Sequence, residues 1–371
     1  MKKLYFLLCL LPACYLQGIA QTGVEILVNN RSLGAVQKYD ETGKYLGDFI
    51  SPGGGGLSAP EDILFHPDGT VLVTGNNNSY IKRYDSKTGA FIGDFSKGFV
   101  LNKPSKMSIG PDSLIYVTQW GSAQDKVVRF DLQGNYVDQF TSTPAPKGLG
   151  HVWDAKGNFY ISLYANGGDG VVQRFDPMGN DMGVFVNTNI LQGPTNIWFD
   201  TNGDLLVEDW TLGKVLRYDS SGQYISTFVT GMTNPEGIAF LPNGDMLIGD
   251  WGQDAVHLVK PDGTLLGLFC TGNGLTDPNC VKVRPATSVN VEAVDKNVVF
   301  VVPTVGRQFL ISTHNTSPIQ VSVINSCGQQ VEQYNTTGNG QWDAHSYPVG
   351  VYCITVYTDG QRYTERVLVI D

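Results

Sequence analysis

The chain has 371 residues, 44 of them glycine, and a formal net charge of −10. A length of about twice an ordinary domain predicts either one large domain with a smaller one or two ordinary domains. The acidic balance, with no cluster of lysine and arginine, argues against nucleic acid and anionic membranes as partners.

The first twenty residues have the organisation of a secretory signal peptide. Two lysines precede an apolar run that is too short to span a bilayer, and small residues close it. We therefore expect residues 1–20 to be a signal peptide removed before Gln21. The mature protein would then be secreted or held at the cell surface, with no transmembrane segment. Residues 11–14 also resemble a lipoprotein processing box, which leaves lipidation at Cys14 as the alternative.

One hairpin pattern recurs six times after the leader. A typical copy has a strand that ends in an aromatic residue and Asp, a short turn with Gly, and a second strand that ends in Phe. Asp accepts hydrogen bonds from the turn backbone and Gly takes its positive φ, so the pattern predicts tight β-hairpins. The sixth copy has Lys260 in the Asp position. The copies lie at residues 36–49, 81–95, 127–140, 172–185, 215–228 and 256–269.

A second pattern precedes the hairpins. It has an apolar residue, a proline three positions later, alternating apolar residues, a turn and an apolar strand. Together with the hairpin it gives four short antiparallel strands in about 43 residues, which is the size of one β-propeller blade. The copies lie at residues 57–73, 101–117, 191–207 and 232–248, and the copy at 148–161 has Gly148 in place of the proline.

The ends of the repeat region predict how the propeller closes. The first hairpin is preceded by only one strand, at residues 25–30, and therefore lacks an innermost strand. Residues 275–283 repeat the proline pattern and then stop, so we expect them to supply that missing strand and remove the free edges of the ring. The prediction is an all-β fold with a six-bladed β-propeller at residues 21–285.

These repeats resemble the six-bladed propellers built from NHL repeats. They resemble more loosely the gluconolactonase family and the propellers of the virginiamycin B lyase type. The resemblance covers about residues 24–285 and rests on the strand and turn periodicity quoted above. It implies the fold, whereas the function has to come from particular residues.

The segment after the repeats has a different alternation. Residues 286–297 form a polar linker, and residues 298–371 predict a small β-sandwich. A Pro-led first strand, a Gly-centred hairpin, a Pro-Val-Gly-Val-Tyr stretch at 348–352 and a final strand with basic and apolar residues occur in that order. They resemble the type A sorting domain of the type IX secretion system, which implies the secretion machinery as a partner. The alternative is a β-sandwich for adhesion or oligomerisation.

Four cysteines remain once the leader is removed. An even number in an oxidising compartment favours disulfides, and pairing between near neighbours in the sequence is the simplest of three connectivities. We therefore expect bonds between Cys270 and Cys280 and between Cys327 and Cys353. Four free thiols are the alternative.

One face of the propeller gathers polar and aromatic residues. Loops that enter the innermost strands and loops that leave the second strands emerge at the same mouth of the central channel. Aromatic walls with a few convergent polar groups describe a ligand site. Packing between blades and anchoring of loops are the alternative roles. The candidates for ligand binding are Glu61, Asp62, Trp120, Tyr164, Asn196, Glu208, Trp210, Glu236 and Trp251.

Oxygen-bearing candidates at this mouth could also hold a cation. Calcium or magnesium takes several such ligands, and the candidates are Glu61, Asn196, Glu208 and Glu236. The resemblance to gluconolactonases likewise implies a metal at the mouth. Zinc is not expected, because the histidines occupy three different places in the repeat. These are His66, His151 and His257.

Three functions are compatible with these observations. The sequence favours a non-catalytic binding protein that takes a glycan, a peptide or a small molecule, because no nucleophile motif or phosphate loop is present and no catalytic residue can be assigned. The acidic residues at the mouth leave a metal-dependent hydrolase, lactonase or lyase as the alternative. A purely structural surface protein is the third possibility.

Overall fold

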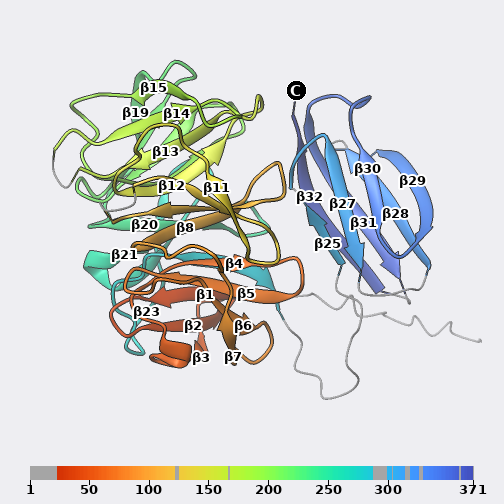
Figure 1. The fold of residues 1–371 in the computed structure, drawn as a ribbon, viewed down its shortest axis with the longest axis horizontal. Coiled ribbons are helices and arrows are strands. Elements are labelled where there is room, and N and C mark those ends of the chain that lie inside the picture. The colour runs from red at the N-terminus through yellow and green to blue at the C-terminus, as the bar shows by residue number, and fades with distance from the viewer. Residues whose placement is uncertain are drawn as a thin grey trace, which may run out of the picture.

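The structure is a computed structural model (Figure 1). It describes residues 23–121, 125–165, 168–286, 299–302, 304–313, 318–325, 329–358 and 361–370. The expected signal peptide, most of the expected linker and Cys327 lie outside these residues. Within them the regular elements are β-strands and two short 3₁₀ turns, η1 (Gly54–Gly56) and η2 (Trp251–Gln253).

The repeats form six four-stranded antiparallel sheets among the described residues. We number these sheets as blades 1 to 6 in chain order. Within each blade we give the strands from the innermost to the outermost. Blade 1 contains β24 (Val281–Pro285), β1 (Val24–Asn30), β2 (Ala35–Asp40) and β3 (Tyr45–Ile50). Blade 2 contains β4 (Pro60–Phe65), β5 (Thr70–Gly75), β6 (Lys82–Asp85) and β7 (Phe91–Asp94), and blade 3 contains β8 (Pro104–Ile109), β9 (Ile115–Gln119), β10 (Val128–Phe130) and β11 (Tyr136–Gln139).

The other three blades repeat the same order of strands. Blade 4 contains β12 (Gly148–Trp153), β13 (Phe159–Leu163), β14 (Val171–Phe175) and β15 (Asp181–Val186). Blade 5 contains β16 (Pro194–Phe199), β17 (Leu205–Asp209), β18 (Lys214–Tyr218) and β19 (Tyr224–Val229). Blade 6 contains β20 (Pro235–Phe240), β21 (Met246–Asp250), β22 (Ala255–Val259) and β23 (Leu265–Thr271).

Strand β24 closes the ring. It pairs antiparallel with β1, so that Val24 lies opposite Pro285 and Val28 lies opposite Val281. The strand before the linker therefore becomes the innermost strand of the N-terminal blade, as the sequence predicted. Apolar packing follows the same closure, because Ile26 of β1 shares a buried cluster with Leu247 and Val256 of blade 6. Five further clusters join the other successive blades.

The recurring turn glycine and strand-end phenylalanine meet between neighbouring blades. Gly134 has a φ of +82°, and a Cβ placed on it would lie 2.1 Å from the backbone oxygen of Phe95 in the preceding blade. Gly43 makes the same approach to Phe269, which again joins blade 6 to blade 1. The repeat therefore needs glycine at this position for close packing of blades as well as for the turn itself.

The C-terminal region forms two sheets. One contains β25 (Val299–Val302), β27 (Gln308–Thr313) and β30 (Gly340–Asp343), and the other contains β26 (Val305–Gly306), β32 (Gln361–Val369), β31 (Gly350–Thr358), β28 (Pro318–Asn325) and β29 (Gln330–Thr337). Their shared core includes Phe309 and Trp342 of the first sheet and Val321 and Ile354 of the second. The predicted fold class, a β-propeller followed by a small β-sandwich, is confirmed.

The predicted disulfide between Cys270 and Cys280 is wrong. Both are buried free thiols, and Cys353 is also free. Cys270 lies on the outer strand β23 and packs in the cluster between blades 6 and 1. Cys280 precedes the innermost strand β24 and packs in the cluster between blades 1 and 2. The two cysteines are close in the sequence, but the width of a blade separates them in the fold.

The contact between turn glycine and neighbouring blade generates a prediction. Gly134→Ala should lower the free energy of unfolding by about 1 to 2 kcal/mol for the left-handed backbone, and by about 1 to 3 kcal/mol more for the steric conflict with Phe95. The matched control is Gly203→Ala, because Gly203 has a φ of +84° and no atom within 4 Å of its added Cβ. Urea unfolding measures both variants, and equal losses would mean that the approach between blades contributes nothing.

Candidate functional site

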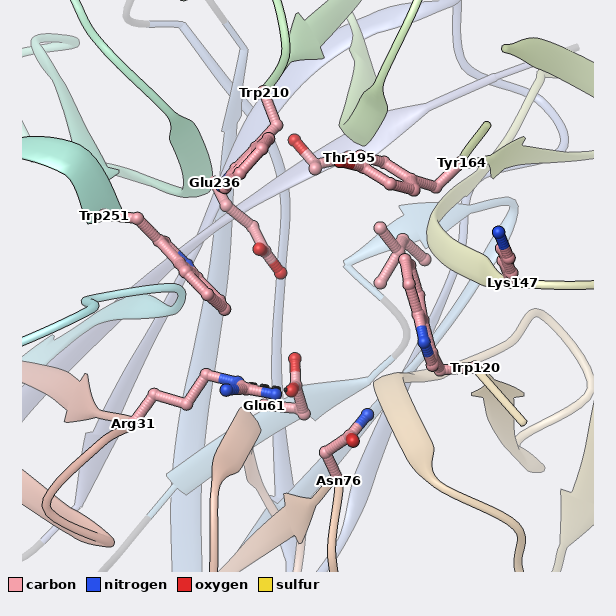
Figure 2. Close-up of a pocket in the computed structure, with 11 residues that line it drawn as sticks. Arg31, Glu61, Asn76, Trp120, Lys147, Tyr164, Thr195, Trp210, Glu236 and Trp251 are labelled. Carbon is pink, nitrogen blue, oxygen red and sulfur yellow. Dashed lines mark hydrogen bonds and ion pairs between the residues drawn. The ribbon is translucent and has the colours of Figure 1, made fainter. Parts of the chain in front are cut away.

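A cavity of about 300 Å³ opens at one mouth of the propeller channel. Figure 2 shows aromatic side chains around this opening, with the carboxylate of Glu236 pointing towards its middle. The lining side chains come from all six blades and their loops. They are Arg31, Glu61, Asn76, Trp120, Lys147, Leu149, Tyr164, Thr195, Trp210, Glu236 and Trp251.

Six of these residues occupy one repeat position. Each immediately follows the second strand of its blade, which places one such side chain per blade around the mouth. Backbone hydrogen bonds fix several of these exits, as in Trp210 N–H to Gly193 O at 2.8 Å and Trp120 N–H to Lys103 O at 2.9 Å. The six are Arg31, Asn76, Trp120, Tyr164, Trp210 and Trp251.

The aromatic side chains form a continuous arc across blades 3 to 6. Ring centroids are 5.1 Å apart between Trp120 and Tyr164, 6.1 Å between Tyr164 and Trp210, and 6.0 Å between Trp210 and Trp251. A cation lies against each end of the arc. The Arg31 guanidinium is 4.8 Å from the Trp251 ring centroid, and the ammonium of Lys147, in the loop before β12, is 5.9 Å from that of Trp120.

Aspartates beneath the arc anchor the loops that carry it. The carboxylate of Asp209 accepts hydrogen bonds from the backbone N–H groups of Gln192 and Gly193, at 2.7 and 3.0 Å. The carboxylate of Asp250 likewise accepts hydrogen bonds from the backbone N–H groups of Thr233 and Asn234, at 2.8 and 2.9 Å. Each tie holds the loop entering the innermost strand against the exit of the second strand. The positions of Trp210 and Trp251 thus depend on buried hydrogen bonds.

A buried lysine occupies the floor of the site. The Lys106 ammonium lies 2.7 Å from Glu236 Oε1 and donates hydrogen bonds to the backbone oxygens of Glu61 and Asn279, at 2.9 and 2.8 Å. Glu61 forms its own ion pair, 2.8 Å from Arg31 Nε, and accepts a hydrogen bond from the Asn279 side chain. Lys106 therefore links blade 3 to blades 6, 2 and 1 across the channel.

Burial perturbs the acidic groups around this lysine. Desolvation, and secondarily the charge of Glu236, raises the pKa of Glu208 to about 8, against the opposing influence of Lys106 and Asn196. The same two causes raise the pKa of Glu61. For Asp62 burial is outweighed by Lys282 and Lys106, which together lower its pKa. Lys282 Nζ lies 3.1 Å from the Asp62 carboxylate.

Six of the nine residues predicted for ligand binding line the cavity, and three do not. Asp62 is turned to Lys282 and to the backbone N–H of Met107. Glu208 is fully buried and accepts a hydrogen bond from the backbone N–H of Gly237, while Asn196 interacts with Glu208. The six in the lining are Glu61, Trp120, Tyr164, Trp210, Glu236 and Trp251.

The lining also includes residues that were absent from the sequence-based list. Arg31 directly follows Asn30, the last residue of both the predicted strand and β1, so the strand bounds alone locate it. Asn76 occupies the same repeat position in blade 2, and a strict alignment of the strand exits would have found both. Lys147, Leu149 and Thr195 surround the starts of innermost strands.

The proposed metal ligands do not form a metal centre here. Among the residues that the structure describes, no group of three or more His, Cys, Asp or Glu side chains is placed to hold an ion. Of the four candidates, Glu61 and Glu236 each pair with a side-chain cation, and Asn196 and Glu208 interact with each other. The donor set at the mouth therefore does not fit calcium or magnesium.

Comparison with known proteins identifies the C-terminal region. Residues 303–370 match the family model of the secretion system C-terminal sorting domain. The protein is therefore exported by type IX secretion, to the cell surface or the medium, as the sequence predicted. No curated protein matches the chain.

Solved structures share the propeller fold. One is from the crystal structure of a nidogen–laminin complex, with 14% identity, a TM-score of 0.58, and coverage of 70% of this chain and 98% of that one. Another is a protein of unknown function from Bacteroides caccae, with 14% identity, a TM-score of 0.56, and coverage of 71% and 100%. At these identities the similarity shows the fold alone.

The described part of the chain contains no helix with the length and apolar character needed to cross a membrane.

The raised pKa of Glu208 predicts a pH dependence of stability. The pKa of Glu208 is about 8 in the folded protein and 4.5 ordinarily, so unfolding between these pH values releases a proton. The free energy of unfolding therefore falls as pH rises through this range. The contribution is at most about 1.4 kcal/mol per pH unit. Urea unfolding from pH 5 to 8 should show a shallower fall for Glu208→Gln than for the unmodified protein. The exposed control Glu41→Gln should keep the original slope, and parallel curves for all three proteins would contradict the prediction.

The sorting domain generates a second prediction. Deleting residues 298–371 in a host with a type IX system should leave a folded propeller in the cell envelope, because the export signal is removed while the ring that β24 closes is retained. Fractionation and immunoblotting measure its distribution against the full chain. An unchanged amount in the medium or on the cell surface would show that export does not need this domain.

Proposed function

We propose that the protein is an exported, non-catalytic binding protein whose channel mouth takes an uncharged glycan. The observation that carries the proposal is the arc of Trp120, Tyr164, Trp210 and Trp251 beside polar groups in one cavity. Sugar rings present apolar C–H faces that pack on aromatic side chains, and hydroxyls that bond to carboxylates and amides. Both requirements are met within a single lining.

The charges at the mouth favour an uncharged ligand. Arg31 pairs with Glu61 and Lys106 pairs with Glu236, so the acidic groups of the lining already have cations beside them. A charged ligand would have to compete with these buried pairs, and breaking such a pair costs several kcal/mol. A neutral ligand can accept or donate hydrogen bonds at the same groups without separating them.

The cavity also suits an extended ligand. The four aromatic rings come from four successive blades, with Arg31 against one end of the arc and Lys147 against the other. Consecutive sugar units could therefore lie against consecutive blades. A hydrolase or lyase function has less support, because the donor set does not fit a metal. The described hydroxyl and histidine that lie together, Ser108 Oγ and His151 Nε2 at 2.5 Å, are not part of the cavity lining.

Binding should depend on the aromatic arc. An array of neutral oligosaccharides would identify a ligand, and calorimetry would give its affinity for the unmodified protein and for Trp120→Ala. We expect this variant to lose at least about tenfold in affinity, or about 1.4 kcal/mol, because a stacking surface is removed. Asn76→Ala should weaken binding through a lost hydrogen bond by about 0.5 to 1.5 kcal/mol.

Tyr224→Ala provides the matched control. Tyr224 is an aromatic residue on the outer strand β19 with 37% of its surface exposed, far from the lining. Its removal should leave affinity within about twofold, a change of about 0.4 kcal/mol. Equal affinities in all variants would exclude the channel mouth as the binding site. The failure of every neutral oligosaccharide to bind would exclude the proposed ligand class.

A further inference from the structure

The surroundings of the Lys106 ammonium have the chemistry of a hard-cation site. The group is fully enclosed, with only 4% of the residue exposed. Its three neighbours are a carboxylate oxygen of Glu236 and the backbone oxygens of Glu61 and Asn279. Carboxylate and backbone carbonyl oxygens are also the ligands that Ca²⁺ takes in proteins. An ammonium has three N–H donors. Here it donates to the two backbone oxygens and forms an ion pair with Glu236 Oε1.

Three blades supply those oxygens. Glu236 lies on β20 of blade 6, Glu61 lies on β4 of blade 2, and Asn279 precedes β24 of blade 1. Lys106 itself comes from β8 of blade 3. A single cation therefore links blade 3 to blades 6 and 1, which are not its neighbours in the ring, as well as to the adjacent blade 2.

Three of the four buried acidic side chains here have a cation beside them, and burial with the charge of Glu236 raises the pKa of the fourth, Glu208. Glu236 has Lys106, Glu61 has Arg31, and Asp62 has Lys282, at separations of 2.7, 2.8 and 3.1 Å. Buried charges need such partners, and a divalent ion added to three satisfied pairs would bring uncompensated positive charge into a buried site. The intact site consequently excludes a metal by occupancy and by charge.

We infer that Lys106 is the protein's built-in substitute for a divalent cation at the channel axis. The propeller is therefore independent of metal, and removal of the ammonium converts its position into a site for a hard divalent cation such as Ca²⁺. In Lys106→Ala, the Glu236 carboxylate loses its cation while the backbone oxygens of Glu61 and Asn279 remain. The inference concerns the cation chemistry of the floor and does not depend on which ligand the aromatic arc binds.

Thermal unfolding with EDTA and with millimolar CaCl₂ tests both the metal independence of the propeller and the cation site expected in Lys106→Ala. The unmodified protein should carry no stoichiometric metal by elemental analysis and should have the same Tm in the two solutions. Lys106→Ala should have a lower Tm in EDTA and should gain about 5 °C or more with CaCl₂, as expected for a cation bound to the native state alone. Calorimetric titration should give about one Ca²⁺ per chain for this variant.

Two further variants locate the effect. Lys147→Ala removes another lysine at the same mouth, one whose ammonium lies over the Trp120 ring, and its Tm should stay insensitive to calcium. Lys106→Ala combined with Glu236→Gln removes the carboxylate ligand, and it should lose the gain seen in the single variant. A gain retained in this double variant would place the ion elsewhere and overturn the inference.

Three other results would also overturn it. The first is stoichiometric metal in the unmodified protein, with a Tm that falls in EDTA. The second is a folded Lys106→Ala whose Tm does not respond to calcium or magnesium. The third concerns the case in which Lys106→Ala is unfolded in EDTA. Refolding from urea in CaCl₂ should then restore the native circular dichroism spectrum. Failure of this variant to refold with calcium or with magnesium would contradict the inference.

Discussion

The pairing of β24 with β1 is the interaction on which the rest of the propeller depends. It joins residues 281–285 to residues 24–28 and leaves no innermost strand missing from the ring. The same closure brings Asn279 to within hydrogen-bond distance of Glu61, although 218 positions separate them in the chain. An open ring would also leave the backbone groups of β1 unpaired at an exposed edge. The geometry of the channel mouth is therefore a consequence of how the two ends of the repeat region meet.

Closure creates an electrostatic requirement at the channel axis. Strands from different blades bring Glu61, Asp62, Glu208 and Glu236 into a space with little access to water. The structure meets this requirement in two ways. Two lysines and an arginine pair with three of these carboxyl groups. Burial and the charge of Glu236 raise the pKa of the fourth, Glu208. Both reduce the cost of buried negative charge. This balance is what makes the floor of the cavity unsuited to a metal.

The residues at the mouth have structural and surface roles at once. Trp210 and Trp251 contact each other with rings nearly perpendicular, which is a packing contact between blades 5 and 6, and both also line the cavity. The carboxylates of Asp209 and Asp250 bind the backbone of neighbouring loops, and Asp250 also lies 3.1 Å from His257 Nε2. A substitution in the arc therefore changes packing as well as surface, and an exposed aromatic control is needed to separate the two effects.

The sequence alone determined the features that repeat. Turn aspartates, turn glycines and strand-end phenylalanines are local signals that recur along the repeats, so strand order and ring closure could be predicted from periodicity, and the sorting domain from its own motifs. The closing strand was predicted at 275–283 and is observed as β24 at Val281–Pro285. Tertiary structure decided the contacts that differ between blades. Nothing in the repeat indicated that Lys106 reaches across the axis to Glu236, that Arg31 pairs with Glu61 of the next blade, or that Cys270 and Cys280 pack on opposite faces of blade 1. The physical reason is that periodicity fixes where each side chain lies within its own blade, whereas ion pairs, pKa values and disulfides depend on distances between blades, which are set only when the ring closes.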